Sequence, residues 1–150
     1  MKKSLVLVMI VLSFLSCKKK KIATQNELDE KIITNYISDN NLNATATGSG
    51  LYYVMTTTGT GIQPNANSNV TVNYKGSLKD GKVFDQSAST GATFNLGSVI
   101  KGWKEGIPLF KKGGKGILLI PSALGYGNQA TGSIPANSVL IFDIDLINVQ

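Results

Sequence analysis

The groups in this sequence that could do chemistry are aromatic and apolar side chains rather than acid–base pairs or nucleophiles. The chain has no histidine, and its single cysteine, Cys17, directly follows an apolar leader. General acid–base and covalent catalysis therefore lack their commonest groups. What remains is an ordered series of motifs: Val72-Asn73-Tyr74-Lys75-Gly76, Asp80-Gly81-Lys82-Val83-Phe84-Asp85, Val99-Ile100-Lys101-Gly102-Trp103-Lys104-Glu105-Gly106, Gly125-Tyr126-Gly127, Ile134-Pro135 and Val139-Leu140-Ile141-Phe142. An aromatic pocket with one or two hydroxyl groups would suit a reaction that breaks no bond.

Each of these residues, taken alone, also has a simpler structural explanation. Tyr74 and Phe142 fall on alternating apolar patterns, where aromatic residues usually pack in a core, and a lone Trp103 is usually core as well. Asp85 alone is typical of a turn residue or a helix cap. Tyr126 between two glycines has less reason to lie in a core. The functional hypothesis therefore rests on the set and its order.

Period-two alternation predicts that strands carry most of these motifs. The alternation covers residues 51–55, 70–74 and 140–146, and the run 116–120 is apolar on both faces. Asp80-Gly81 is a hairpin signal. One short helix is expected between Val99 and Phe110, because Trp103, Ile107 and Phe110 recur at helical spacing. Several antiparallel strands with one helix over their apolar face predict an α+β domain.

An amphipathic helix is predicted ahead of the strand-rich region. Its apolar stripe consists of Leu28, Ile32 and Tyr36, with Ile33 and Ile37 beside them. Thr24 or Asn26 could cap it. The stripe would pack against the main domain, form a dimer contact or dock a partner, and the sequence leaves these alternatives open. The polar stretch 43–50 that follows is typical of a linker.

Composition and charge narrow the classes of partner. The 150 residues allow one domain with an appendage, and an apolar share of 42% can build a core. The net charge of +6 comes from Lys2, Lys3 and Lys18–Lys21, since nine lysines and nine acids balance from Ile22 onward. There is no arginine and no zinc-type ligand cluster. We therefore expect no nucleic-acid partner, which would need clustered Lys and Arg.

The first seventeen residues resemble the leader of a bacterial lipoprotein. The apolar run Leu5–Leu15 is shorter than the about 20 residues that span a bilayer, and it matches a signal-peptide core. It closes with Phe14-Leu15-Ser16-Cys17, which resembles a lipobox. The resemblance implies that Cys17 is lipidated as the mature N-terminus; the alternative is a free or buried thiol. Lys18–Lys21 would form a solvated tether or attract anionic lipids.

In their order and spacing, the motifs from about Leu51 to Gln150 resemble FKBP-type peptidyl-prolyl cis-trans isomerases. The element Gly102–Gly106 and the final strand are the most specific parts. The resemblance implies a twisted, half-open antiparallel β-sheet wrapped on a short α-helix, with the site between them. It divides the chain into a lipoprotein signal peptide (1–16), a lipidated cysteine with a Lys-rich tether (17–24), an N-terminal helix with linker (25–49) and an isomerase domain (50–150).

The resemblance also implies a role for each pocket position. Six residues would be catalytic: Tyr74, Phe84, Asp85, Trp103, Tyr126 and Phe142. Four would contact substrate: Phe94, Val99, Ile100 and Ile134. Trp103 would be the floor under a proline ring, and the Ile100 N–H and the Tyr126 hydroxyl would donate hydrogen bonds to carbonyls. Asp85 would be the pocket carboxylate, and Ile134 would reach the site from a covering loop.

The sequence departs from the family pattern in three places. The stretch 86–93 is shorter than in small cytosolic relatives and lacks the arginine that often pairs with the carboxylate, here Asp85. A wall aromatic falls on Ala92, with Phe94 close behind, which would open one side of the pocket. The loop 128–133 lacks the histidine of some members. These departures bear on peptide preference and on macrolide affinity.

By the resemblance, the protein is a lipid-anchored isomerase that accelerates Xaa–Pro isomerisation and assists folding of envelope proteins, without metal or cofactor. Its partners would be proline-containing polypeptides, and the macrolides of the family would be candidate inhibitors. It would sit on the inner or outer membrane, in the periplasm or at the cell surface. The alternative is a binding or scaffold module of an envelope complex with little or no turnover. Client proteins, membrane leaflet and oligomeric state stay open.

Overall fold

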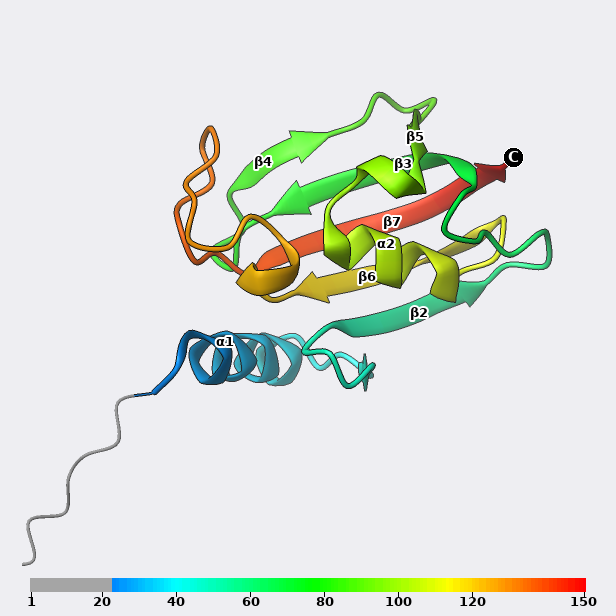
Figure 1. Ribbon diagram of the computed structural model, residues 1–150. Coiled ribbons are helices and arrows are strands. Elements are labelled where there is room, and N and C mark those ends of the chain that lie inside the picture. Colours follow the sequence, from blue (N-terminus) through cyan, green and yellow to red (C-terminus); the bar gives the residue numbers. More distant parts are fainter. Residues whose placement is uncertain (1–22) are drawn as a thin grey trace, which may run out of the picture.

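A twisted antiparallel sheet forms the body of the computed structural model, which describes residues 23–150 (Figure 1). Its seven strands follow the order β1-β2-β6-β7-β3-β4, and β5 pairs with β3. The strands are β1 (Thr45–Ala46), β2 (Tyr52–Thr58), β3 (Asn69–Ser77), β4 (Val83–Gln86), β5 (Ala92–Asn95), β6 (Gly114–Ile120) and β7 (Leu140–Val149). The helices are α1 (Gln25–Asp39) and α2 (Lys101–Gly106), with 3₁₀ turns η1 (Leu96–Ser98), η2 (Ile107–Leu109) and η3 (Ser122–Leu124). The predicted α+β fold is confirmed.

The central strand β7 shows why the sheet has a dry face and a charged face. Leu140, Phe142, Ile144 and Leu146 are buried in the main core, under α2 (Figure 1). The intervening acids point to the other face, where the Asp143 carboxylate lies 3.0 Å from the Lys75 ammonium and Asp145 lies 2.7 Å from Lys115. The alternation predicted from the sequence thus fixes which side of the sheet the short helix covers.

The predicted hairpin at Asp80-Gly81 is confirmed and joins β3 to β4. The Leu78 N–H donates to the Lys82 carbonyl at 2.9 Å, and the Lys82 N–H donates to the Asp80 carboxylate at 3.0 Å. Gly81 has a φ of +84°, a left-handed conformation that glycine adopts without a steric cost. The turn pairs Asp85 of β4 with Gly76 of β3. Asp85 therefore lies close to Tyr74, which comes two residues before Gly76 on the same strand.

Helix α1 packs against the main domain, which is the first of the three alternatives that the sequence left open for its apolar stripe. Thr24 caps it in a capping box with Glu27. Ile33 is fully buried with Leu119 and Ile141, on the sheet face opposite α2.

The expected stripe is wrong at one position. Leu28 is 44% exposed, whereas the neighbouring Asp29 is fully buried. The helix is therefore turned so that an acid, not a leucine, faces the domain. The physical reason is a partner for the carboxylate far along the chain, at Ser122.

The stretch 43–50, expected as a linker, holds more structure than a linker would. Thr45–Ala46 forms the edge strand β1 and pairs with β2. The hydroxyls of Thr47 and Ser49 both donate to the Glu105 carboxylate, at 2.6 and 2.7 Å, and so tie this segment to α2. The segment between α1 and β2 is therefore part of the packed domain.

The signal peptide, Cys17 and the Lys-rich tether lie outside the described residues, so their predicted roles stay predictions. Within residues 23–150, neither helix has the length and apolar character needed to cross a bilayer.

Candidate active site

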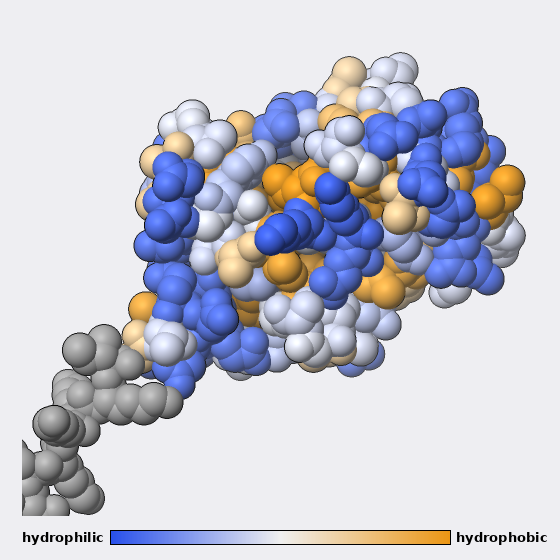
Figure 2. All heavy atoms as spheres, viewed as in Figure 1, coloured by the Kyte–Doolittle hydropathy of each residue, from blue (hydrophilic) through white to orange (hydrophobic). Residues whose placement is uncertain are grey.

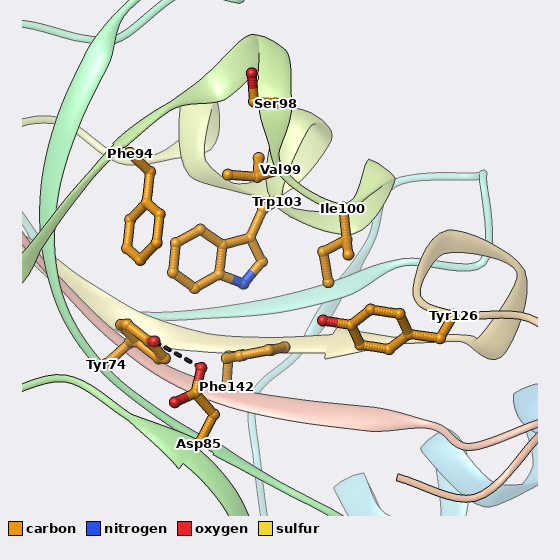
Figure 3. Close-up of a pocket in the computed structure, with 9 residues that line it drawn as sticks. All are labelled: Tyr74, Asp85, Phe94, Ser98, Val99, Ile100, Trp103, Tyr126 and Phe142. Atoms are coloured by element: carbon orange, nitrogen blue, oxygen red, sulfur yellow. Dashed lines mark hydrogen bonds between the residues drawn. The ribbon is translucent and has the colours of Figure 1, made fainter. Parts of the chain in front are cut away.

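A cavity of about 340 Å³ opens between the sheet and the segment that begins α2 (Figure 3). Nine residues line it: Tyr74, Asp85, Phe94, Ser98, Val99, Ile100, Trp103, Tyr126 and Phe142. The first three and Phe142 come from strands of the sheet, and the others from η1, α2, the two residues between them and the loop after η3. Figure 2 shows apolar surface gathered near the centre of this face, between more hydrophilic residues. Residues spread over much of the chain thus meet at one apolar site.

Trp103 forms the inner end of the cavity and is only 4% exposed. Its ring lies 5.1 Å from Tyr74, 5.3 Å from Phe94 and 5.4 Å from Phe142 between centroids, each in an edge-to-face arrangement. Such pairs are favoured because the positive edge of one ring meets the negative face of another. The indole is therefore held in one orientation by three rings from three different strands.

Glycines on α2 set the depth at which Trp103 sits. A Cβ at Gly102 would lie 2.5 Å from Ile120 Cγ2, and a Cβ at Gly106 would lie 2.7 Å from Leu118 Cδ1. Only glycine lets the helix approach β6 this closely. The spacing of the two glycines around Trp103 in the sequence is thus explained by contact with the sheet.

The indole nitrogen of Trp103 is buried and has no hydrogen-bond partner among residues 23–150. In Figure 3 it points toward Phe142. The inner end of the cavity is therefore formed by a ring whose one polar atom is buried.

The carboxylate of Asp85 accepts a hydrogen bond from the Tyr74 hydroxyl at 2.7 Å (Figure 3). Burial raises the pKa of Tyr74 to about 12, and the bond to Asp85 adds to this shift. The hydroxyl is therefore protonated at neutral pH and remains a donor. Sequence reasoning did not find this pairing of Tyr74 with Asp85.

Two of the hydrogen-bond donors at the cavity have no partner among residues 23–150. The Ile100 N–H precedes α2 and donates to no backbone carbonyl in the described part of the chain. The Tyr126 hydroxyl points into the cavity in Figure 3, and the side chain is 38% exposed. Both groups are free to donate to carbonyl oxygens of a bound chain.

Two predicted residues lie outside the cavity lining. Phe84 packs behind Phe142, with ring centroids 5.5 Å apart, over Gly76, where a Cβ would lie 2.7 Å from the Phe84 ring. Ile134 is 6% exposed and belongs to the main core. Their predicted roles at the site stay predictions.

The wall that the sequence assigned to position 92 is formed by Phe94. This residue lies on the same face of β5, two positions further on, and its ring centroid is 5.8 Å from that of Tyr74. The side of the pocket expected to be open near Ala92 therefore carries an aromatic ring.

Ser98 was missed by the sequence analysis. It ends the 3₁₀ turn η1, which Asn95 caps by accepting from the Gly97 N–H at 2.9 Å. The Asn95-x-Gly97 pattern before Val99 was the available signal for this turn.

Among residues 23–150, no three Asp, Glu, His or Cys side chains converge in a way that could hold a metal ion.

Comparison with known proteins places this chain among well-described relatives. A family model described as FKBP-type peptidyl-prolyl cis-trans isomerase matches residues 60–147. The isomerase FkpA of Aeromonas hydrophila is 47% identical over 107 residues, which cover 70% of this chain and 40% of the relative. FkpA of Escherichia coli (strain K12) is 40% identical over 143 residues, 93% of this chain and 52% of the relative. The chain thus spans about half the length, or less, of these curated relatives.

Solved structures agree with this result. The crystal structure of FkpA from Escherichia coli superposes with a TM-score of 0.74 at 39% identity, covering 83% of this chain and 59% of that one. A peptidyl-prolyl cis-trans isomerase from Pseudomonas syringae pv. tomato gives a TM-score of 0.72 at 34% identity, covering 87% and 99%. The chain belongs to the family of FKBP-type peptidyl-prolyl cis-trans isomerases.

Proposed function

We propose that this protein is a peptidyl-prolyl cis-trans isomerase that accelerates rotation about Xaa–Pro bonds in extended polypeptides. The observation that carries the proposal is the cavity itself, an apolar site with Trp103 at its inner end and free donors at its mouth. Its volume of about 340 Å³ suits a small ring with the adjoining peptide groups. Membership of the family supports the same activity.

The reaction needs no bond cleavage, only relief of amide conjugation. An Xaa–Pro bond interconverts slowly because the barrier is about 18–20 kcal/mol. In the twisted transition state the conjugation is lost, and the carbonyl oxygen carries less negative charge than in the planar amide. A dry aromatic cavity stabilises the less polar twisted form relative to the planar form, which lowers the barrier by differential binding.

Each side chain of the site has a part in this proposal. Trp103 and the rings around it would hold the proline ring and exclude water. The Ile100 N–H and the Tyr126 hydroxyl would each bind a carbonyl oxygen on either side of the rotating bond and so fix the twisted geometry. The bond from Tyr74 keeps the Asp85 carboxylate directed at the cavity, where its field acts on the amide. No proton needs to move, so neither group is assigned acid–base chemistry.

The setting of the reaction is also proposed. We infer a lipid anchor at Cys17 after removal of residues 1–16, a tether over 17–24, a helix with linker over 25–49 and the isomerase domain over 50–150. Proline-containing envelope proteins would be the substrates, in the periplasm or at the cell surface, and family macrolides would compete for the cavity. The lipobox-like sequence before Cys17 supports the anchor, and the names of the bacterial relatives support the activity.

Refolding of a test protein limited by prolyl isomerisation distinguishes catalysis from binding. One molecule of isomerase serves many chains, so a few per cent of the purified protein should abolish the slow refolding phase. A binding module would act only when present in at least equal amount to the folding chain. Acceleration that requires stoichiometric protein would therefore favour the scaffold alternative, and no effect at any ratio would contradict both.

A further inference from the structure

Asp29 of α1 is a fully buried carboxylate that the site described above does not use. Its Oδ2 accepts hydrogen bonds from the Ser122 N–H at 2.8 Å and from the Ser122 hydroxyl at 2.6 Å. Its Oδ1 accepts from the Gln25 side-chain amide at 2.6 Å. A buried charge is costly unless such donors compensate it, so the carboxylate and Ser122 must stay together in the folded chain.

Ser122 in turn holds the residues on both sides of Tyr126. Its carbonyl oxygen accepts from the Gly125 N–H at 3.0 Å and from the Gly127 N–H at 2.8 Å. Ser122 therefore binds the N-terminal helix through its N–H and hydroxyl, and it binds the Gly125-Tyr126-Gly127 turn through its carbonyl oxygen. Two successive hydrogen-bonded links, from Asp29 to Ser122 and from Ser122 to the two glycines, therefore connect Asp29 to the backbone that carries Tyr126.

The Tyr126 turn has little else to hold it. The residue lies in a loop after η3 and is 38% exposed, so packing fixes its direction only in part. The other backbone hydrogen bonds that the described residues give this turn run from the Asn137 N–H to the Gly127 carbonyl at 2.8 Å and from the Gln129 N–H to the Tyr126 carbonyl at 3.2 Å. A loop with few buried contacts opens easily, and the hydroxyl that must meet a substrate carbonyl would then be poorly placed.

We propose that Asp29 is a positioning residue for Tyr126. Through this residue, the N-terminal helix holds the Tyr126 hydroxyl in its direction toward the cavity. This inference rests on the proposed isomerase function. It assigns a role in the reaction to α1, which lies wholly outside the matched family region 60–147. The rival explanation is that the Asp29–Ser122 contact merely fastens α1 to the domain.

The first test compares three single variants of the full chain in a tetrapeptide isomerisation assay. Asp29→Ala should lower kcat/KM about threefold to tenfold, the same factor as Tyr126→Phe, which is the effect of losing one hydrogen bond. Asp29→Asn keeps an oxygen acceptor for Ser122 and should retain most of the activity. The matched control is Tyr52→Phe, which removes a different side-chain bond of α1, from the Tyr52 hydroxyl of β2 to the Glu30 carboxylate, and leaves the Tyr126 turn untouched.

A double variant separates positioning from simple fastening. If Asp29 acts through Tyr126, adding Asp29→Ala to Tyr126→Phe should cost no further activity. Additive losses, or an equal loss in Tyr52→Phe, would overturn the proposal. Should Asp29→Ala fail to fold, Ser122→Ala removes only the hydroxyl donor and should show a smaller loss with the same non-additivity.

Amide hydrogen exchange gives a readout that does not depend on turnover. The Gly125 and Gly127 amides should exchange at least tenfold faster in Asp29→Ala than in the unchanged protein or in Tyr52→Phe. Unchanged exchange at both glycines would overturn the positioning role even if activity fell. A protein that shows this exchange pattern but no turnover would instead contradict the proposed isomerase function and leave the structural link intact.

Discussion

At the scale of single residues, the Tyr74–Asp85 pair is the clearest electrostatic feature of the site. The sequence showed both residues and their order but not their contact, because they lie on separate strands brought together by the β3–β4 hairpin. In the structure the Asp85 carboxylate accepts a hydrogen bond from the Tyr74 hydroxyl. The proposed mechanism uses the field of this carboxylate, which lines the cavity.

The raised pKa of Tyr74 predicts a pH dependence of stability. Below pH 10.0 its hydroxyl is protonated in both folded and unfolded chains, and its stabilising contribution is fully present. As the pH rises toward about 12, the unfolded chain loses the proton first, so this contribution falls. Urea unfolding should therefore show a loss of stability over this window that is absent in Tyr74→Phe. Parallel curves for the two proteins would contradict a raised pKa.

The glycine at position 102 allows a prediction about elements, since it sets the contact between α2 and β6. Gly102→Ala places a Cβ against Ile120 and should push the helix, with Trp103, away from the sheet. We expect a loss of about 1–3 kcal/mol in the free energy of unfolding, and reduced turnover. Lys104→Ala, at an exposed position of the same helix, is the control and should leave both unchanged. Denaturant unfolding and the tetrapeptide assay measure the two effects.

The packing of α1 allows a second prediction at this scale. Ile33→Ala should lower the free energy of unfolding by about 2–4 kcal/mol, because the side chain is fully buried beside Leu119 and Ile141. Leu28→Ala, on the exposed side, should change it by less than about 0.5 kcal/mol. Similar losses in the two variants would mean that α1 packs in another rotation.

These elements also show how far the sequence could predict the fold and the site. Alternation predicts β7 and its buried face correctly, because a strand with one dry face leaves a period-two record in its own residues. Helical spacing predicts α1 but not its rotation. A buried acid looks like a surface residue until its partner is known, and Ser122 lies 93 residues away.

The same limit applies within the pocket. Trp103, Tyr74, Phe142 and Tyr126 were found because each stands in a distinct local motif. Ser98 carries no motif of its own. That Phe94 rather than residue 92 forms the wall depends on the register of β5, and the pattern of a single sequence fixes strand register poorly.

At the scale of the whole molecule, the net positive charge lies in the N-terminal residues and not in the folded domain. Residues from Ile22 onward are neutral in sum, and the excess of lysine lies at Lys2, Lys3 and Lys18–Lys21. This division suits a domain held near a membrane surface by its N-terminal end. The free energy of anchoring would come from acyl chains, at about 0.8 kcal/mol per buried CH₂ group, rather than from the folded domain.

Lipidation at Cys17 predicts a change in partitioning. Expressed with its leader in a bacterium, the protein should enter the detergent-rich phase of a detergent that separates on warming. Cys17→Ser should leave it in the aqueous phase, since no thioether to a lipid can form. If both proteins partition alike, the proposed anchor is wrong, whatever the activity of the domain.

The most direct test of the central claim is the rate of cis-to-trans conversion of Xaa–Pro tetrapeptides with the purified protein and two variants. The account predicts clear acceleration by the unchanged protein and a loss of about tenfold or more in kcat/KM for Asp85→Leu, which removes a charged hydrogen-bond acceptor at an exposed position. Asp143→Leu removes a carboxylate on the opposite sheet face and should retain activity. No acceleration by a folded, unchanged protein would contradict the account.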